Sequence, residues 1–446
     1  MNKNVRVFFS SLWEWLLSFG PFVALGVALM VGAYHWLDPN PPKQVVLATG
    51  PEQSAYDAIG QQYAKALSAY GIDVKLLPTE GSAHNLDLLR SGQADLAFVQ
   101  GGGVAWTDTD RQNLTALGNL FVEPLWVFYR QDSAQRLVGR PELTQLRDLQ
   151  GARINVGTEG SGVPRLFETL LEANGIAPER WQRSEWAPTP AVVAFLNQEI
   201  DVVVFASAPE SPLVQMLLQS PGVGLMDFAQ SEAYARRFGF LTPVVLPQGV
   251  VDLAKNQPPR DVRLVAPTST LLTSQNTHPA IVQLFAQTAV NLHSAPGWFN
   301  RARQYPSLDH AEIEVSAEAA RAIRNGQPWL QRYWPFWLAN LVERMWLAGG
   351  VILALVLPLS RILPPLYTLR VRSKVFRWYA ELQEIEERVE RSASAQDTQA
   401  QFLALDRLEA TVEHVQVPLP YANELYALRS HIRWVRKRLM QHQPSH

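Results

Sequence analysis

Residues 44–100 decide the fold, and they read QVVLATGPEQSAYDAIGQQYAKALSAYGIDVKLLPTEGSAHNLDLLRSGQADLAFVQ. Three short apolar runs in this stretch have the length of buried strands, and two longer amphipathic segments between them are typical of helices. The predicted strands are residues 44–49, 72–77 and 94–99, and the predicted helices are residues 55–70 and 82–91. Strands that alternate with helices predict a parallel sheet covered by helices, so this stretch is an α/β unit.

The alternation restarts further along the chain and predicts a second lobe. Strands are expected at residues 152–156, 200–205 and 262–266, and helices at residues 143–150, 162–174, 191–198, 209–219 and 279–294. The chain is expected to cross between the lobes near Arg130 and to return near Val245. Lobe I then comprises residues 44–130 and 246–340, and lobe II comprises residues 131–245.

Two segments are apolar enough to span a membrane, which takes about 20 residues. Residues 15–37 carry no Asp, Glu, Lys or Arg, and their end, residues 34–36, is Tyr-His-Trp. Aromatic residues there are typical of a membrane interface and not of a signal-peptide cleavage site, so we expect an uncleaved anchor. The second segment is residues 341–367, whose charge-free centre lies between Arg344 and Arg361. The alternative for this segment is a buried amphipathic helix.

Basic residues flank both segments on their outer sides. Lys3 and Arg6 precede the first segment, and residues 370–377 carry four Lys and Arg residues after the second. Positive residues stay on the cytoplasmic side, so both termini are expected inside the cell and the central region outside the cytoplasm. Residues 1–37 are therefore the cytoplasmic start and anchor of a multi-pass protein of the inner (cytoplasmic) membrane, and the proline-rich residues 38–43 form a linker.

Residues 368–446 show apolar stripes separated by charged residues. The stripes, at spacings of three and four, are Trp378, Leu382, Ile385 and Val389, then Leu405, Leu408, Val412 and Val415, and then Leu425, Leu428, Ile432, Val435 and Leu439. Each stripe covers about two heptads, which is short for a long coiled coil. The pattern predicts a small cytoplasmic helical bundle or a coiled-coil element through which copies of the chain form a homo-oligomer.

Composition excludes several classes of function. The 39 basic and 41 acidic residues leave a net charge of -2, so no global field favours nucleic acid, and the absence of cysteine excludes disulfides, thiolate nucleophiles and cysteine metal sites. The histidines lack metal-ligand spacing. Ser161 lies between glycines, but Gly160 directly precedes it, so the G-x-S-x-G nucleophile elbow is absent. We expect no enzyme, no catalytic residue, no metal and no cofactor.

Small and polar residues follow the predicted strands where an α/β sheet binds ligands. Free N–H groups at helix N-termini favour carboxylate or phosphate, and glycine lets a ligand approach the backbone. The candidate ligand-binding residues are Thr49, Gly50, Ser54, Tyr56, Ser82, Asn85, Gln100, Gly101, Thr158, Ser161 and Gly162. The alternative is that Ser54 and Ser82 only cap helices and that Tyr56 belongs to the core.

Several short motifs carry a family resemblance. They are ATG at 48–50, Tyr56 with Gly60, EGS at 80–82 with Asn85-Leu86, LRSGQADLAFVQ at 89–100, NVG at 155–157, GSG at 160–162, Ile200-Asp201 and LTPVVLP at 241–247. With these motifs, most of residues 44–295 resembles the TAXI-type solute receptors that serve TRAP transporters. The resemblance implies the two-lobed periplasmic-binding-protein fold of type II, which closes on small carboxylates or amino acids.

These observations predict a membrane-tethered extracytoplasmic solute-binding protein that captures a small organic anion or amino acid and delivers it to a TRAP permease. The alternative is a ligand sensor or scaffold that signals across the membrane to its cytoplasmic helices and a cytoplasmic regulator. Glu159 leaves the ligand charge open, because it would repel an anion or hold an ammonium group, unless it is a solvated loop residue.

Overall fold

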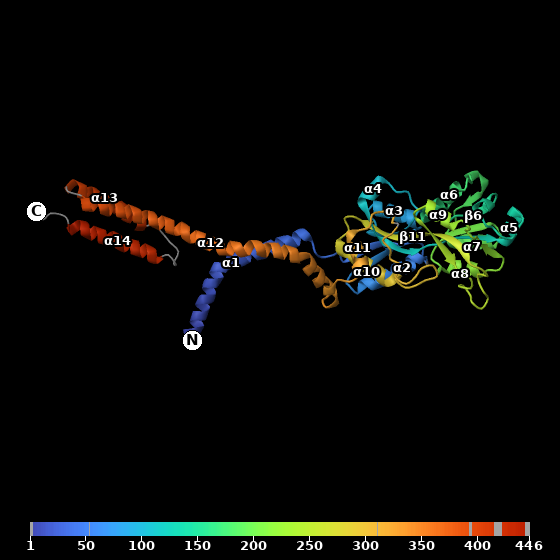
Figure 1. Cartoon of the computed structure of the whole chain (residues 1–446), viewed down its shortest axis with the longest axis horizontal. Helices are drawn as coiled ribbons and strands as arrows, with labels where there is room; N and C mark the ends of the chain where they lie inside the picture. The colour runs from blue at the N-terminus through green and yellow to red at the C-terminus, as the bar shows by residue number, and fades with distance from the viewer. Residues whose placement is uncertain (1–2, 53, 310, 392–394, 414–421, 442–446) are drawn as a thin grey trace. The chain divides into compact units, whose positions relative to one another are not determined.

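The computed structural model describes residues 3–441 except 53, 310, 392–394 and 414–421 (Figure 1). It contains two compact units. One comprises Pro39–Glu343 and is here called the globular unit, and the other comprises Met1–Asp38 with Arg344–His446 and is called the helical unit. Because each unit is compact by itself, each is described in turn.

The globular unit is a mixed α/β structure with two sheets. Its strands are β1 (Gln44–Ala48), β2 (Asp73–Leu77), β3 (Leu96–Gln100), β4 (Leu114–Val122), β5 (Leu125–Arg130), β6 (Arg153–Asn155), β7 (Gln182–Ser184), β8 (Val202–Ala206), β9 (Val223–Leu225), β10 (Leu241–Leu246) and β11 (Val262–Ser274). Its helices are α2 (Ala55–Ser68), α3 (Ser82–Arg90), α4 (Asp108–Asn113), α5 (Gln131–Val138), α6 (Val163–Ala173), α7 (Pro188–Leu196), α8 (Pro212–Gln219), α9 (Ser231–Arg237), α10 (Pro279–His293) and α11 (Ala317–Asn325). Short 3-10 turns lie at η1 (Leu146–Leu149), η2 (Glu159–Ser161), η3 (Pro178–Arg180) and η4 (Trp329–Arg332).

The sheet that contains the strands of lobe I has the order β10-β11-β3-β1-β2, and β4 also pairs with β11; β10 and the first part of β11 extend this sheet into lobe II. Strands β1, β2 and β3 are parallel, whereas β11 is antiparallel to β3, β4 and β10. The expected parallel sheet is therefore correct for β1, β2 and β3 and wrong for the pairings of β11, which runs opposite to the other five strands. Side chains alternate between the faces, so Leu47 and Phe98 pack in a core with α2 and α10, while Ala48 and Val99 pack in a core with α3. Helices thus cover both faces (Figure 1).

The sheet of lobe II has the order β7-β6-β8-β5-β9, with β5 antiparallel to β8 and β9. Its core contains the fully buried rings of Trp126, Phe128, Phe167 and Phe195. Strands β6, β7 and β8 are parallel, so this lobe also combines the two strand directions.

The helix expected at residues 143–150 is wrong, because only the single 3-10 turn η1 forms there. Leu143, Leu146 and Leu149 are all buried, and their spacing of three matches the three residues per turn of a 3-10 helix. Asp148 closes the turn by accepting a hydrogen bond from the backbone N–H of Thr144 at 2.9 Å.

The crossings between the lobes differ from those expected. Strands β4 and β5 belong to different sheets, so the chain leaves lobe I at Glu123-Pro124 and not near Arg130. It returns inside β11, whose residues 262–266 lie in the core of lobe II while residues 269–273 pair with β3 in lobe I. The turn after Val245 is a loop between β10 and β11 within lobe II, so it does not mark the boundary.

The helical unit contains α1 (Lys3–Leu37), most of α12 (Phe336–Arg391), α13 (Ala395–Glu413) and α14 (Ala422–Gln441). Two stretches, Gly20–Leu37 and Phe336–Leu363, are long and apolar enough to cross a membrane by length and composition. The side chains of Gly20–Leu37 and of Leu341–Leu363 are all at least partly exposed, except that of Ser360. The alternative of a buried amphipathic helix for the second segment therefore does not fit the described residues. Helix α12 begins in the globular unit, where Phe336 packs in the core of lobe I.

Helices α12, α13 and α14 share one apolar core. Its buried side chains are Leu382, Ile385, Leu405, Leu408, Val412, Leu425, Leu428, Ile432 and Val435. They belong to the three predicted stripes; Val415 and the side chains of Val389 and Leu439 lie outside the described part of the chain. Arg438 joins α14 to α12 through an ion pair with Glu386 at 3.0 Å.

Candidate ligand-binding cleft

A cavity of about 340 Å³ lies between the two lobes. Lobe I contributes Pro51, Glu52, Ser54, Ala55, Tyr56, Glu80, Gly81 and Gln100; the crossing contributes Glu123; and lobe II contributes Gly157, Thr158, Ser161, Val163, Ala187, Pro188, Thr189, Pro190, Val204, Phe205, Ala206, Ser207, Ser211, Pro212 and Leu213. The volume is in the range of small-molecule sites. The cavity lies where strands β3 and β8 end, as the α/β pattern predicts.

A second cavity of about 370 Å³ lies beside the crossing, between α2, α10 and residues 295–300. It shares Ser54, Ala55, Ser211 and Pro212 with the interlobe cavity. The interlobe cavity is the better candidate because it holds the strand ends, a buried carboxyl group and a polar atom without a partner, described below.

Tyr56 and Glu123 form a buried polar pair in the cavity wall. The Tyr56 hydroxyl donates a hydrogen bond to Glu123 Oε2 at 3.1 Å, and the Tyr56 ring stacks on Phe98 at 5.1 Å between centroids. Burial raises the pKa of the Glu123 carboxyl to about 8, and burial, with the nearby Glu123, raises the pKa of Tyr56 well above its ordinary value. Sequence reasoning missed Glu123. The available signal was a single acidic residue inside the apolar stretch 114–129.

Gln100 presents a polar atom without a partner. Its side chain lines the cavity and is 2% exposed, yet Nε2 makes no hydrogen bond within the described protein. A buried N–H donor without a partner costs about 1–3 kcal/mol. A ligand acceptor in the cavity would remove this cost.

Asn85 and Thr49 hold the strand ends together beneath the cavity. Asn85 Nδ2 donates to the carbonyl oxygens of Thr49 at 2.6 Å and Phe98 at 2.7 Å, and Asn85 Oδ1 accepts from the Thr79 hydroxyl at 2.7 Å. Both residues are fully buried and neither lines the cavity. The geometry therefore supports a positioning role for them.

Ser82 was expected to cap α3, and this is wrong. The N-cap is Gly81, with φ of 133°, and Ser82 is the first residue of the helix. The Ser82 hydroxyl oxygen instead accepts a hydrogen bond from the backbone N–H of Gln100 at 2.9 Å, which ties α3 to the end of β3. At α2 the expected cap is correct, because Ser54 Oγ accepts from the N–H of Asp57.

The lobes touch through glycine-rich loops. A Cβ on Gly81 would lie 2.9 Å from Ser161 Cα, and a Cβ on Gly103 would lie 3.3 Å from Gly162 Cα. The Gly160 N–H also donates to Glu80 Oε2 at 3.3 Å across the same contact. Because side chains would separate these backbones, the glycines permit the lobes to close over the cavity.

The sequence-predicted residues thus divide into two groups. Ser54, Tyr56, Gln100, Thr158 and Ser161 line the cavity, while Thr49, Gly50, Ser82, Asn85, Gly101 and Gly162 lie around it. Glu159 is exposed and is absent from the described lining, so its ambiguous charge does not bear on the cavity.

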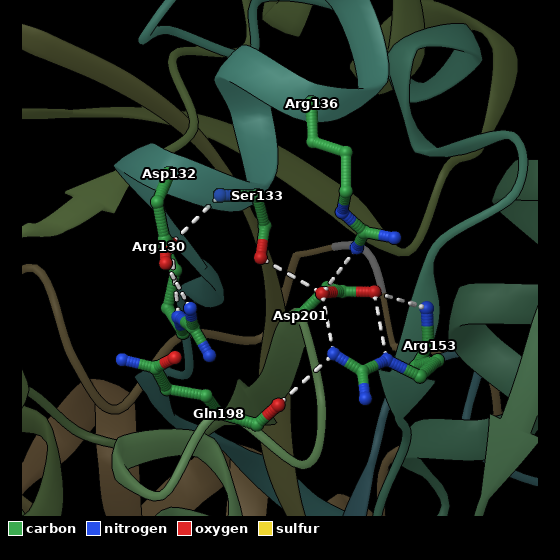
Figure 2. Close-up of polar contacts among 7 residues, drawn as sticks. All are labelled: Arg130, Asp132, Ser133, Arg136, Arg153, Gln198 and Asp201. Carbon is green, nitrogen blue, oxygen red and sulfur yellow. Dashed lines mark hydrogen bonds and ion pairs between the residues drawn. The ribbon is translucent and has the colours of Figure 1, made fainter.

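A buried ion cluster supports lobe II at the opposite end of β8 (Figure 2). Asp201 is fully buried and accepts hydrogen bonds from Ser133 Oγ at 2.8 Å, Arg136 Nη2 at 2.6 Å and Arg153 Nη2 at 2.9 Å. Burial alone would raise the pKa of Asp201, but these donors hold it well below the ordinary value. The cluster fixes α5, β6 and β8 relative to one another, and β8 carries Phe205 into the cavity wall.

Both lobes fall within one family match. A model described as the NMT1-like family matches residues 47–291. The chain belongs to the NMT1-like family. The matched residues include every described residue of the cavity lining. The family description does not name the TAXI subtype, which stays a prediction.

Solved structures that are similar to this chain include three bacterial proteins. A protein of Bordetella bronchiseptica RB50 is 17% identical, with 68% of this chain and 82% of that chain covered and a TM-score of 0.40. The alkanesulfonate-binding protein of Xanthomonas axonopodis pv. citri, bound to MOPS, is 14% identical, with 71% and 84% covered and a TM-score of 0.38. The periplasmic aliphatic sulphonate binding protein of Escherichia coli is 16% identical, with 71% and 78% covered and a TM-score of 0.35.

Proposed function

We propose that this chain is a solute-binding protein whose two lobes close around a small molecule. The main support for the proposal is the interlobe cavity, which lies beside glycine-rich loops of the two lobes whose backbones are in direct contact. The chain passes between the lobes at Glu123-Pro124 and within β11, and residues 298–305, which follow α10 of lobe I, also pack against the core of lobe II. Rotation about these segments would open and close the cavity, as in hinge-type domain closure.

We propose binding and not catalysis at this cleft. Ser161, the nearest approach to a nucleophile, donates its hydroxyl proton to the Thr158 carbonyl oxygen at 2.7 Å. A serine nucleophile needs a base within hydrogen-bond reach. No histidine or lysine lies among the described residues that line the cavity.

We propose that the helical unit tethers the protein to the inner membrane, with the lobes outside the cytoplasm and both termini inside. Two apolar helical stretches support the tether. Exposed aromatic side chains just before and at the start of the second stretch add support, since Trp329 is 70%, Tyr333 80% and Trp337 61% exposed. Tryptophan and tyrosine favour the membrane interface. Since the chain has no cysteine, single cysteines can be introduced. An impermeant maleimide applied to spheroplasts should label K65C and not E387C; the reverse pattern contradicts this topology.

We propose that the protein delivers the bound solute to a TRAP-type permease. This follows from the resemblance of its motifs to those of TAXI-type solute receptors. The shared core of α12, α13 and α14 favours one alternative, a sensor that passes lobe closure to these helices. Cysteine crosslinking between the helical faces that carry Leu408 and Leu428 distinguishes the two uses. A sensor changes this crosslinking pattern on ligand addition, and a delivery receptor leaves it unchanged.

Lobe closure provides the direct test of solute binding. Spin labels at K65C in α2 and R236C in α9 report the distance between exposed positions on the two lobes. The full chain in detergent is screened by thermal shift against carboxylates, amino acids and amines, since a ligand that binds the folded state raises Tm. Compounds that raise Tm should also shift the interlobe distance distribution. If no compound changes either measurement, solute binding by this cleft is rejected.

A further inference from the structure

We propose that the solute is an organic amine with a neutral hydroxyl or carbonyl oxygen and an apolar body, whose ammonium group pairs with Glu123. This inference rests on the solute-binding function proposed above and specifies its ligand class. It differs from the organic anion that the sequence motifs imply.

The first argument is the charge of the cavity. Its described titratable carboxyl groups are Glu52, Glu80 and Glu123, and no Lys, Arg or His stands among the described lining residues. A carboxylate ligand would meet acidic groups with no cation to balance it. An ammonium group would instead favour the ionised form of Glu123, so the buried carboxyl group would release its proton when the amine binds.

The second argument is the position of Glu123. Its carboxyl group is 3% exposed and lines the cavity at the crossing between the lobes. Within the described structure, Tyr56 is its one side-chain hydrogen-bond donor, and no Lys, Arg or His forms an ion pair with it. Glu80, in contrast, already accepts the Gly160 N–H across the lobe contact, and Glu52 is exposed. Glu123 is therefore the carboxyl group best placed to receive a ligand cation.

The third argument concerns donors that an anion would use. Helix N-termini usually offer several free N–H groups, but α7 starts Pro188-Thr189-Pro190 and α8 starts at Pro212. Proline has no N–H, so α7 lacks the donors of its first and third residues and α8 lacks the donor of its first, which leaves fewer donors for an anion than helix ends without proline. The same residues, with Val204 and Phe205, form an apolar wall for the body of the ligand.

The fourth argument is Gln100, whose buried Nε2 has no partner within the described protein. An amide N–H is a neutral donor, which suits a hydroxyl or carbonyl oxygen. The ligand therefore carries an oxygen acceptor in addition to its amine. The two polar contacts, with Glu123 and Gln100, would orient the ligand within the apolar wall.

Four compounds that share one carbon skeleton distinguish the effect of the ligand's ammonium group from that of its carboxylate group. Valinol carries an amine and a hydroxymethyl group, valine an amine and a carboxylate, 2-hydroxy-3-methylbutanoate a hydroxyl and a carboxylate, and 3-methylbutane-1,2-diol neither charge. Binding to the full chain in detergent is measured by titration calorimetry. We expect valinol to bind at least about tenfold more tightly than the hydroxy acid or the diol, and more tightly than valine, since a hydrogen bond to a charged group adds about 1.5–3 kcal/mol.

Three substitutions assign the preference to a residue. E123Q retains an oxygen acceptor for Tyr56 but cannot ionise to pair with an ammonium group, so it should lower valinol affinity at least about tenfold and leave diol affinity unchanged. E159Q makes the same charge change at an exposed residue outside the described lining and should bind valinol like the native chain. E123D keeps an ionisable carboxyl group at the same position and should keep the preference for valinol, which serves as a check should E123Q fail to fold.

The outcomes separate this inference from the proposed function. Tightest binding by the hydroxy acid or by valine, with the interlobe distance shortened, overturns the ligand class while solute binding stands. A loss of valinol preference in E159Q, or its persistence in folded E123Q, overturns the assignment to Glu123. Absence of binding by all four probes also overturns the ligand class, and the spin-label screen then decides whether the cleft binds any solute.

Discussion

The buried carboxyl of Glu123 should make the stability of the globular unit depend on pH, and E123Q should remove that dependence. Burial raises the pKa of Glu123 from 4.5 to about 8 in the folded protein. Between these values the folded protein keeps the proton that the unfolded chain releases. The stabilising contribution of the protonated group is therefore complete below pH 4.5 and is lost as the pH rises through 8.

The magnitude follows from the pKa difference. Each pKa unit corresponds to about 1.4 kcal/mol, so the native chain should lose about 4–5 kcal/mol of unfolding free energy across this window because of Glu123. The side chain in E123Q is neutral at every pH and can still accept the Tyr56 hydrogen bond. We expect the two proteins to have similar stability at pH 4.5 and E123Q to be more stable by about 4 kcal/mol at pH 8.

Urea unfolding of the ligand-free full chain in detergent, at several pH values, measures this difference. His293, whose pKa burial lowers to about 4, also makes stability depend on pH, but it is present in both proteins and cancels in the comparison. If the difference between E123Q and the native chain stays constant from pH 4.5 to 8, the carboxyl is not desolvated. The reasoning about the cavity would then fail at its central residue.

Three further substitutions test the frame of the cleft. D201N should cost about 1.5–3 kcal/mol in urea unfolding because it removes the fully buried charge that accepts hydrogen bonds from the partly exposed Arg136 and Arg153, whereas E142Q, in an exposed ion pair, should cost less than about 1 kcal/mol; similar values would refute a stabilising role for buried Asp201. N85A should lower the unfolding free energy by about 2–4 kcal/mol, since two buried carbonyl groups and a hydroxyl each lose a hydrogen-bond partner. A cost below about 1 kcal/mol would argue against a positioning role for Asn85. G103V should lengthen the interlobe spin-label distance and weaken ligand binding, while G239A, which has open space around it, should do neither.

Local patterns predicted helices α2, α3, α6, α7, α8 and α10 and the central parallel strands, but they missed α4, α5, α9 and α11. The amphipathic period of α2 and the apolar runs of β1 and β3 depend only on neighbours in the chain, which is why sequence reasoning found them within a few residues. The stripes of the C-terminal helices are local in the same sense, and nine of their residues meet in one core. In the site, the glycines at positions 81 and 162 could be anticipated, because the backbone there has a positive φ and glycine adopts such values readily.

Strand partners and lobe boundaries were decided by the tertiary structure. The apolar stretch 114–130 gives no local sign that β4 and β5 belong to different sheets, and β11 changes lobe in the middle of a continuous strand. The crossing at Glu123 places this carboxyl group in the cavity wall, where it contacts Tyr56 from a distant segment of the chain. The amino-acid sequence by itself therefore determined the elements and their apolar faces, since these follow from short-range periodicity. Only the tertiary structure decided which strands pair, where the lobes meet and which carboxyl is buried between them, because these depend on contacts between distant residues.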